Sequence, residues 1–101
     1  MITGTSLTSH ELDLIREVLR HHPDVTGAIL FGSRAKGTAS PSSDIDLALE
    51  GITDPLLVEA IAQELDELPL PYHFDLKALA AIRHQPLREH IARVGVRILG
   101  N

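Results

Sequence analysis

Two aspartates stand one residue apart at the start of an apolar run, in the stretch D-I-D-L-A-L-E that begins at Asp44. In an extended strand, residues two apart point to the same face, so the carboxylates of Asp44 and Asp46 are expected side by side. Like charges this close repel each other, which raises one pKa or calls for a cation. Oxygen ligands of this kind suit a hard divalent ion, Mg²⁺ or Mn²⁺.

A third acid, Asp75, follows in the apolar stretch F-D-L. If its strand lies beside the strand of Asp44 and Asp46, three carboxylates converge on one place. Three acids can hold two metal ions, and two metal ions can activate an attacking oxygen and stabilise a leaving phosphate. The competing interpretation is that Asp-x-Asp pairs also occur on exposed strands without any function.

The loop upstream of the aspartates has a composition that suits phosphate binding, being rich in Gly, Ser and Pro over residues 32–43. Gly32 allows a backbone to approach a ligand closely. Ser33 offers a hydroxyl and begins a helical turn, whose free N–H groups attract phosphate. Arg34 and Lys36 add positive charge where a triphosphate needs it. A simple turn is the competing interpretation of the Gly-Ser pair.

The elements that must position these residues follow from the apolar spacing and from capping signals. Thr8 and Glu11 form a capping box before a helix that stops by Pro23, and Asp54 with Pro55 starts a second helix. The pattern predicts strands at 25–31, 44–50, 72–77 and 96–99, helices from 8 and over 55–68 and 86–94, and a short helical turn within 78–82. The order αββαβ(α)αβ indicates an α/β or α+β fold.

Composition restricts the class of protein. The 101 residues are expected to form a single domain, 1–101, with no signal peptide, no membrane span and a cytoplasmic location. The absence of cysteine excludes disulfides and thiolate zinc sites. A net charge of −5 argues against general nucleic-acid binding.

Tyr72 is expected to be a packing residue rather than an acceptor of modification. The middle helix, including Leu56, is expected to bury its apolar stripe.

At these residues the chain resembles the nucleotidyltransferase superfamily with the polymerase-β-like fold, and most of all its minimal nucleotidyltransferase (MNT) group, the antitoxin partners of HEPN toxins. The resemblance rests on G-S-R-A-K-G-T-A-S-P-S-S-D-I-D-L, residues 32–47, on F-D-L at 74–76 and on the end of the chain, 88–99. It implies a small mixed β-sheet of about four strands with helices packed on one face.

The resemblance also implies roles. Gly32 and Ser33 match the pair that grips the nucleotide phosphates. Asp44 and Asp46 match two metal-binding acids, and Asp75 matches the third, which also helps to activate the attacking hydroxyl. Further nucleotide contacts are expected from Arg34, Lys36 and Ser43. The cofactors implied are two Mg²⁺ ions, with Mn²⁺ as an alternative, and ATP is the substrate.

The activity implied is transfer of AMP from ATP to a hydroxyl, in the first place a tyrosine, of a cognate HEPN toxin, with the protein acting as antitoxin. Two alternatives stay open: a non-catalytic nucleotide-binding antitoxin that neutralises its partner by contact, and nucleotidyl transfer to a small molecule. The expected partners are the HEPN toxin and a nucleoside triphosphate, without nucleic acid or membrane. Edge strands make a homo- or hetero-oligomer plausible.

Overall fold

The computed structural model describes residues 7–32 and 44–100. The order of elements is the one predicted from the sequence, and boundaries differ from the prediction by up to two residues. The elements are α1 (Ser9–Arg20), β1 (Gly27–Phe31), β2 (Ile45–Glu50), α3 (Pro55–Asp66), β3 (Phe74–Ala78), the 3₁₀ turn η1 (Leu79–Ala81), α4 (Gln85–Val94) and β4 (Val96–Leu99).

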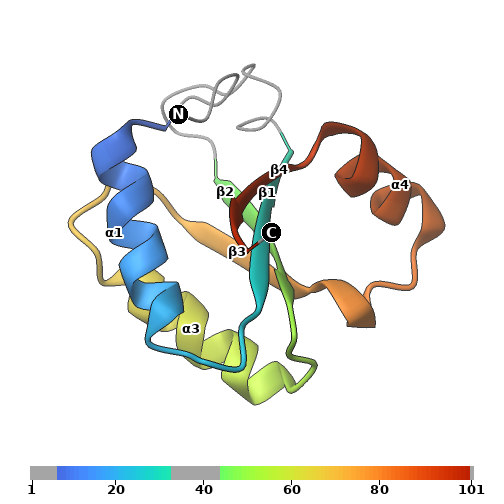
Figure 1. Ribbon diagram of the computed structural model, residues 1–101, viewed down its shortest axis with the longest axis horizontal. Helices are drawn as coiled ribbons and strands as arrows, with labels where there is room; N and C mark the ends of the chain where they lie inside the picture. The colour runs from blue at the N-terminus through green and yellow to red at the C-terminus, as the bar shows by residue number, and fades with distance from the viewer. Residues whose placement is uncertain (1–6, 33–43, 101) are drawn as a thin grey trace.

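Four strands form one mixed sheet in the order β3-β2-β1-β4 (Figure 1). β1 pairs antiparallel with both β2 and β4, whereas β2 and β3 are parallel. A parallel pair requires a crossover, and α3 supplies it between β2 and β3. The mixed four-stranded sheet expected from the sequence is confirmed, and its parallel pair joins the two strands that carry the acids.

Local capping interactions start the two long helices where the sequence predicts them. The Thr8 side chain accepts from the Glu11 backbone N–H at 3.1 Å, and the Glu11 carboxylate accepts from the Thr8 N–H at 2.9 Å. Asp54 accepts from the Leu56 N–H at 2.9 Å, with Pro55 at the first helical position. These bonds satisfy backbone donors that the first helical turn leaves without partners.

The larger hydrophobic core lies between one face of the sheet and the helices α1 and α3 (Figure 1). Alternate strand residues point into it, among them the fully buried Leu30, Leu47 and Leu49. From α3 it receives Ile61 and Leu65, but Leu56 remains 78% exposed. The predicted apolar stripe of this helix is therefore wrong at Leu56, whose side chain is exposed to solvent, whereas the adjacent Leu57 and Val58 pack against the core.

A second, smaller cluster lies on the opposite face of the sheet, where Ile91 of α4 packs against Phe31 and Ala48. The helices are predicted to pack on one face; α1 and α3 do so, whereas α4 covers part of the other face (Figure 1). Arg88 ties α4 to the preceding turn by donating to the carbonyls of Leu79 and Ile82 at 2.9 and 3.0 Å. The face that carries the acids is thus half covered.

Long-range polar contacts connect the elements. The Tyr72 hydroxyl donates to Glu11 at 2.7 Å, and its ring packs against the larger core, which confirms the packing role predicted for it. Arg16 donates to the Ile98 carbonyl at 2.6 Å, and Arg97 forms an ion pair with Glu50. The contact of Arg16 holds β4 against α1, and the ion pair of Arg97 holds β4 against the end of β2.

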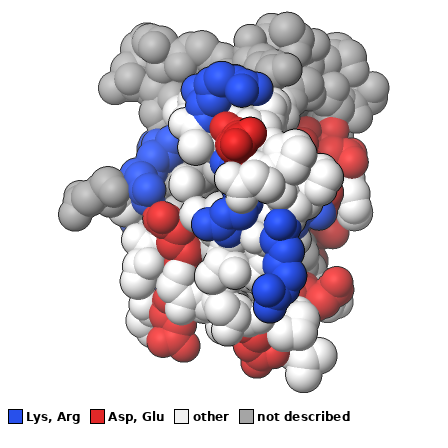
Figure 2. All heavy atoms as spheres, turned by 90° about the vertical axis from the view of Figure 1, so that its right-hand side faces the viewer, with Lys and Arg blue, Asp and Glu red and all other residues white. Residues whose placement is uncertain are grey.

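Charges are unevenly distributed along the chain. Residues 37–76 contain no Lys or Arg, whereas the following segment carries five: Lys77, Arg83, Arg88, Arg93 and Arg97. Accordingly, Lys and Arg side chains spread over the side of the molecule that carries α4 (Figure 2). Within the described part of the chain, the helices are too short or too polar to cross a membrane.

Candidate active site

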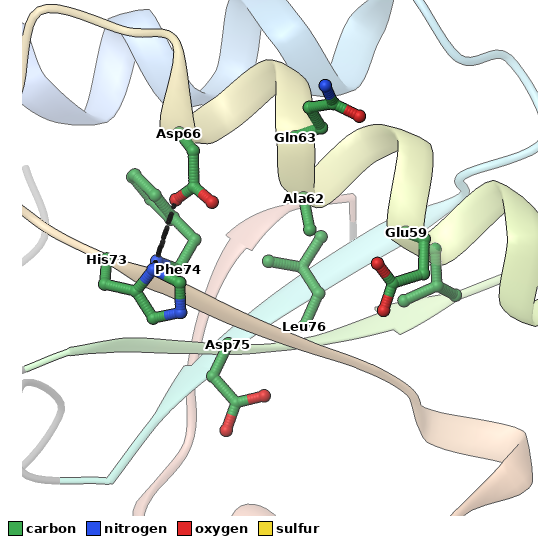
Figure 3. Close-up of a pocket in the computed structure, with 9 residues that line it drawn as sticks. Glu59, Ala62, Gln63, Asp66, His73, Phe74, Asp75 and Leu76 are labelled. Atoms are coloured by element: carbon green, nitrogen blue, oxygen red, sulfur yellow. Dashed lines mark hydrogen bonds and ion pairs between the residues drawn. The ribbon is translucent and has the colours of Figure 1, made fainter.

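Asp46 of β2 and Asp75 of β3 are direct register partners across the parallel pair of strands. Residues paired in this way point to the same face, so the two carboxylates lie side by side. That face is opposite to α3, and Asp75 points away from this helix (Figure 3). The structure therefore brings together the second and third of the predicted acids, as the parallel pairing requires.

Gly32 follows the last residue of β1 and lies directly beside Asp46. Its φ of 75° is a left-handed conformation that favours glycine. A Cβ atom placed on Gly32 would collide with Oδ2 of Asp46, so a side chain there would displace the carboxylate. The preceding residue, Phe31, is the register partner of Asp46 in β1, which explains the proximity. The predicted glycine and the predicted acid thus form one compact unit.

The carboxylates perturb one another. Burial raises the pKa of Asp46 above its ordinary value, and the negative charges of Asp75 and Asp44 raise it further. Asp44, exposed and one residue before β2, therefore belongs to the same electrostatic cluster. An unfavourable accumulation of negative charge is the condition that a bound cation relieves.

Two cationic or titratable side chains partly compensate the acids. Lys77 Nζ lies 3.7 Å from Asp75 Oδ1, and the charges of Lys77 and His90 both act to lower the pKa of Asp46. The His90 ring, on α4, meets the Phe31 ring edge-on at a centroid distance of 6.4 Å. No role is predicted for either residue from the sequence. The two-residue spacing from Asp75 does place Lys77 on the same face, whereas His90 arrives only through packing of α4.

The acids fit a divalent cation that is shared with a nucleotide. Within residues 7–32 and 44–100, no three His, Asp or Glu side chains already form a group that could hold a metal ion alone. Mg²⁺, however, is commonly bound by one or two carboxylates together with waters and substrate phosphates. The side-by-side Asp46 and Asp75, with Asp44 adjacent, supply that kind of donor set.

Four of the predicted site residues fall outside the described part of the chain: Ser33, Arg34, Lys36 and Ser43. Their contacts with the nucleotide remain predictions. The two-residue spacing in the sequence predicts that His73 shares a face with Asp75, but His73 is exposed and its Nδ1 lies 3.7 Å from Asp66 Oδ1 of α3 (Figure 3).

A groove of about 400 Å³ runs between α3 and the outer edge of β3 (Figure 3). We call it the edge groove. Its α3 wall holds the acids Glu59 and Asp66, and its strand wall includes Leu76 and extends to Asp75. The full lining is Val58, Glu59, Ala62, Gln63, Asp66, His73, Phe74, Asp75 and Leu76. The groove therefore ends next to the paired aspartates.

The fold and the acid pair together define a nucleotidyltransferase. The family model described as polymerase beta, nucleotidyltransferase, matches residues 13–101, and the chain belongs to this family.

The chain is also similar to one named protein in sequence and to solved toxin–antitoxin structures in fold. It is 36% identical over 93 residues to the probable protein adenylyltransferase MntA of Haemophilus influenzae, covering 89% of this chain and 80% of the relative. A crystal structure of a toxin–antitoxin with AMP-PNP superposes with a TM-score of 0.78 at 28% identity, over 89% of this chain and 73% of the other. A tri-AMPylated Shewanella oneidensis HEPN toxin in complex with MNT antitoxin gives a TM-score of 0.74 at 23% identity, with 94% and 74% coverage, a likeness of fold.

Proposed function

We propose that the protein transfers AMP from ATP to a hydroxyl group of a HEPN toxin, in the first place a tyrosine, and so acts as an antitoxin. The observation that carries the proposal is the pairing of Asp46 with Asp75 on one face of the sheet, with Gly32 packed against Asp46. The 36% identity to a probable protein adenylyltransferase supports a protein acceptor. The 28% identical toxin–antitoxin with AMP-PNP supports a nucleotide-using antitoxin.

In the proposed reaction, the acceptor oxygen attacks the α-phosphorus of ATP. The bond from that phosphorus to the bridging oxygen breaks, pyrophosphate leaves, and the hydroxyl proton passes to a carboxylate. Asp75 is the proposed proton acceptor, with Lys77 holding its charge in place at 3.7 Å. Gly32 leaves room for the phosphates beside Asp46, and Ser33, Arg34, Lys36 and Ser43 complete the predicted phosphate contacts.

Asp44, Asp46 and Asp75 are the proposed ligands of two Mg²⁺ ions, with Mn²⁺ as the alternative. Bound there, the metal would neutralise the phosphates and acidify the acceptor hydroxyl. The raised pKa of Asp46 supports this assignment, because a cation would offset both the burial and the repulsion from Asp75 and Asp44 that raise it.

Incubation with labelled ATP, Mg²⁺ and the toxin partner should label the partner. The double variant Asp44→Asn/Asp46→Asn removes two charges at nearly constant volume. We expect its transfer rate to fall by at least about a hundredfold, as for loss of groups acting directly on the reacting atoms. Labelling at the wild-type rate would disprove the mechanism.

A neutralisation assay separates transfer from silencing by contact. If transfer is what disarms the toxin, the double variant fails to rescue cells while still binding the partner in a pull-down. Rescue by the double variant would favour the contact model. Asp13→Asn, on the exposed surface of α1, is the control for a general charge effect.

A further inference from the structure

β3 is an edge strand whose outer side is open next to Asp75. Among the strands of the described part of the chain, it pairs with β2 alone. The Ile45 N–H donates to the His73 carbonyl at 2.9 Å, so the backbone groups of Asp75 face β2 in this parallel ladder. The N–H and C=O of Leu76 consequently face away from the sheet, and among the described residues no hydrogen bond to them is found. Such an edge can pair with another extended chain.

The other end of this edge is already closed. The Phe74 N–H, which also faces outward, donates to Asp66 Oδ1 of α3 at 3.2 Å. An added strand would therefore form its backbone bonds at Leu76 rather than at Phe74. The open part of the edge is thus the part that lies immediately beside the paired aspartates.

The charge beside this edge is negative. Glu59 and Asp66 line the edge groove, and both are exposed. His73 offsets part of this charge when it is protonated, being 3.7 Å from Asp66. Lys77 does not reduce this charge, because it points to the face of the sheet that carries the acids, where it pairs with Asp75. A segment that inserts side chains into the edge groove is therefore favoured if they are Lys or Arg.

We propose that the edge of β3 binds an extended segment of the acceptor protein as an added strand, with the hydroxyl residue opposite Asp75 and a basic residue on each side of it. The proposal rests on the proposed function. A residue opposite Asp75 would have its Cβ roughly 5 Å from the Asp75 Cβ and on the same face as both acids. Side chains alternate along a strand, so the two neighbours of this residue would point to the face that carries α3 and into the edge groove.

The test uses the full chain and two short synthetic peptides, one with Lys-Tyr-Lys at its centre and one with Glu-Tyr-Glu. Binding is followed by amide NMR shifts and by fluorescence anisotropy. We expect the basic peptide to shift the Leu76 amide and to bind at least about tenfold more tightly than the acidic one. Equal affinities, or shifts confined to α4, would overturn the proposal.

A charge reversal in the groove provides the matched comparison. Glu59→Lys should weaken binding of the basic peptide about tenfold, whereas Glu17→Lys, the same change at an exposed position of α1, should leave it unchanged. If both variants bind alike, the edge groove is not the site.

Adding ATP and Mg²⁺ to the peptide-bound protein distinguishes failure of this proposal from failure of the proposed function. A peptide that becomes AMP-labelled without any shift at Leu76 refutes docking at β3 and leaves the transfer reaction intact. A peptide that docks at β3 without being labelled supports the docking and counts against tyrosine as the acceptor.

Discussion

At the scale of single residues, the site depends on side chains that oppose the stability of the fold. Asp46 is half-buried beside two other carboxylates, and its pKa is raised mainly by that burial. Beside it, Gly32 has a left-handed φ of 75°, which glycine adopts without strain. Charge-burdened positions such as Asp46 are characteristic of functional sites, where stability is exchanged for a prepared geometry.

Replacing Gly32 separates backbone strain from the loss of the site. Gly32→Ala should lower the free energy of unfolding by about 1–3 kcal/mol, because alanine is strained at positive φ. It should also abolish transfer, since the new Cβ collides with Oδ2 of Asp46. Gly51→Ala is the matched control: Gly51 also has positive φ, at 95°, but its Cβ would meet Asp24 and Thr26. Thermal melts and transfer assays on both variants check this; full activity in Gly32→Ala would contradict it.

The raised pKa of Asp46 makes the stability of the protein depend on pH in a definite direction. The folded state retains the Asp46 proton over a range in which the unfolded state, with the ordinary value of 3.8, has released it. The destabilisation is therefore absent below 3.8 and grows as pH rises through the folded-state pKa. Asp46→Asn should gain more stability over wild type at pH 7 than at pH 3.5.

Urea unfolding at the two pH values measures this difference. Asp13→Asn, exposed on α1, controls for removing any negative charge from a chain with net charge −5. An Asp46→Asn gain that is constant with pH, or larger at acid pH, would contradict a raised pKa of Asp46 in the folded state.

At the scale of elements, the parallel pair β2–β3 is what assembles the acids. It places Asp46 opposite Asp75, and α3 provides the connection that a parallel pair needs. The buried Ile61 and Leu65 fasten α3 to the larger core. The position of the third acid therefore depends on the packing of this helix against the core.

The cap of α3 can be tested without touching the site. Asp54→Ala should cost about 1 kcal/mol, since the Leu56 N–H loses its acceptor at 2.9 Å. Asp54→Asn is the control, because asparagine caps helices about as well as aspartate. Transfer activity should be unchanged in both variants at temperatures well below their melting points. Equal stabilities of the two variants would show that the cap contributes nothing.

At the scale of the whole molecule, the proposed binding of metal and nucleotide at the acidic cluster predicts a coupling between ligand binding and stability. A ligand that binds only the folded state stabilises it by mass action, by about 2.7 kcal/mol at a hundred times its dissociation constant. We expect Mg²⁺ with ATP to raise the melting temperature of the wild-type chain, and ATP with EDTA to do so far less. The increment should vanish in Asp44→Asn/Asp46→Asn and persist in Asp13→Asn.

The architecture was accessible from the sequence where local signals are strong. The capping box at Thr8, the Asp54-Pro55 start and the alternation after Asp44 each correspond to an element of the structure. The convergence of Asp75 with Asp46 could be predicted only on the condition that their strands are neighbours, because which strands lie side by side depends on long-range contacts. The approach of His90 from α4 and the exposure of Leu56 also depend on how helices pack. The roles of residues 33–43 and the single-domain extent remain predictions.

The charge burden on Asp46 has an evolutionary consequence. A laboratory selection that rewards heat resistance alone should repeatedly discard this carboxylate, since its removal relieves the burial of its charge and the repulsion from Asp75 and Asp44. Under the proposed mechanism, the most robust members of such a lineage would then be catalytically dead. Retention of the acid under thermal selection would require a simultaneous demand for toxin neutralisation.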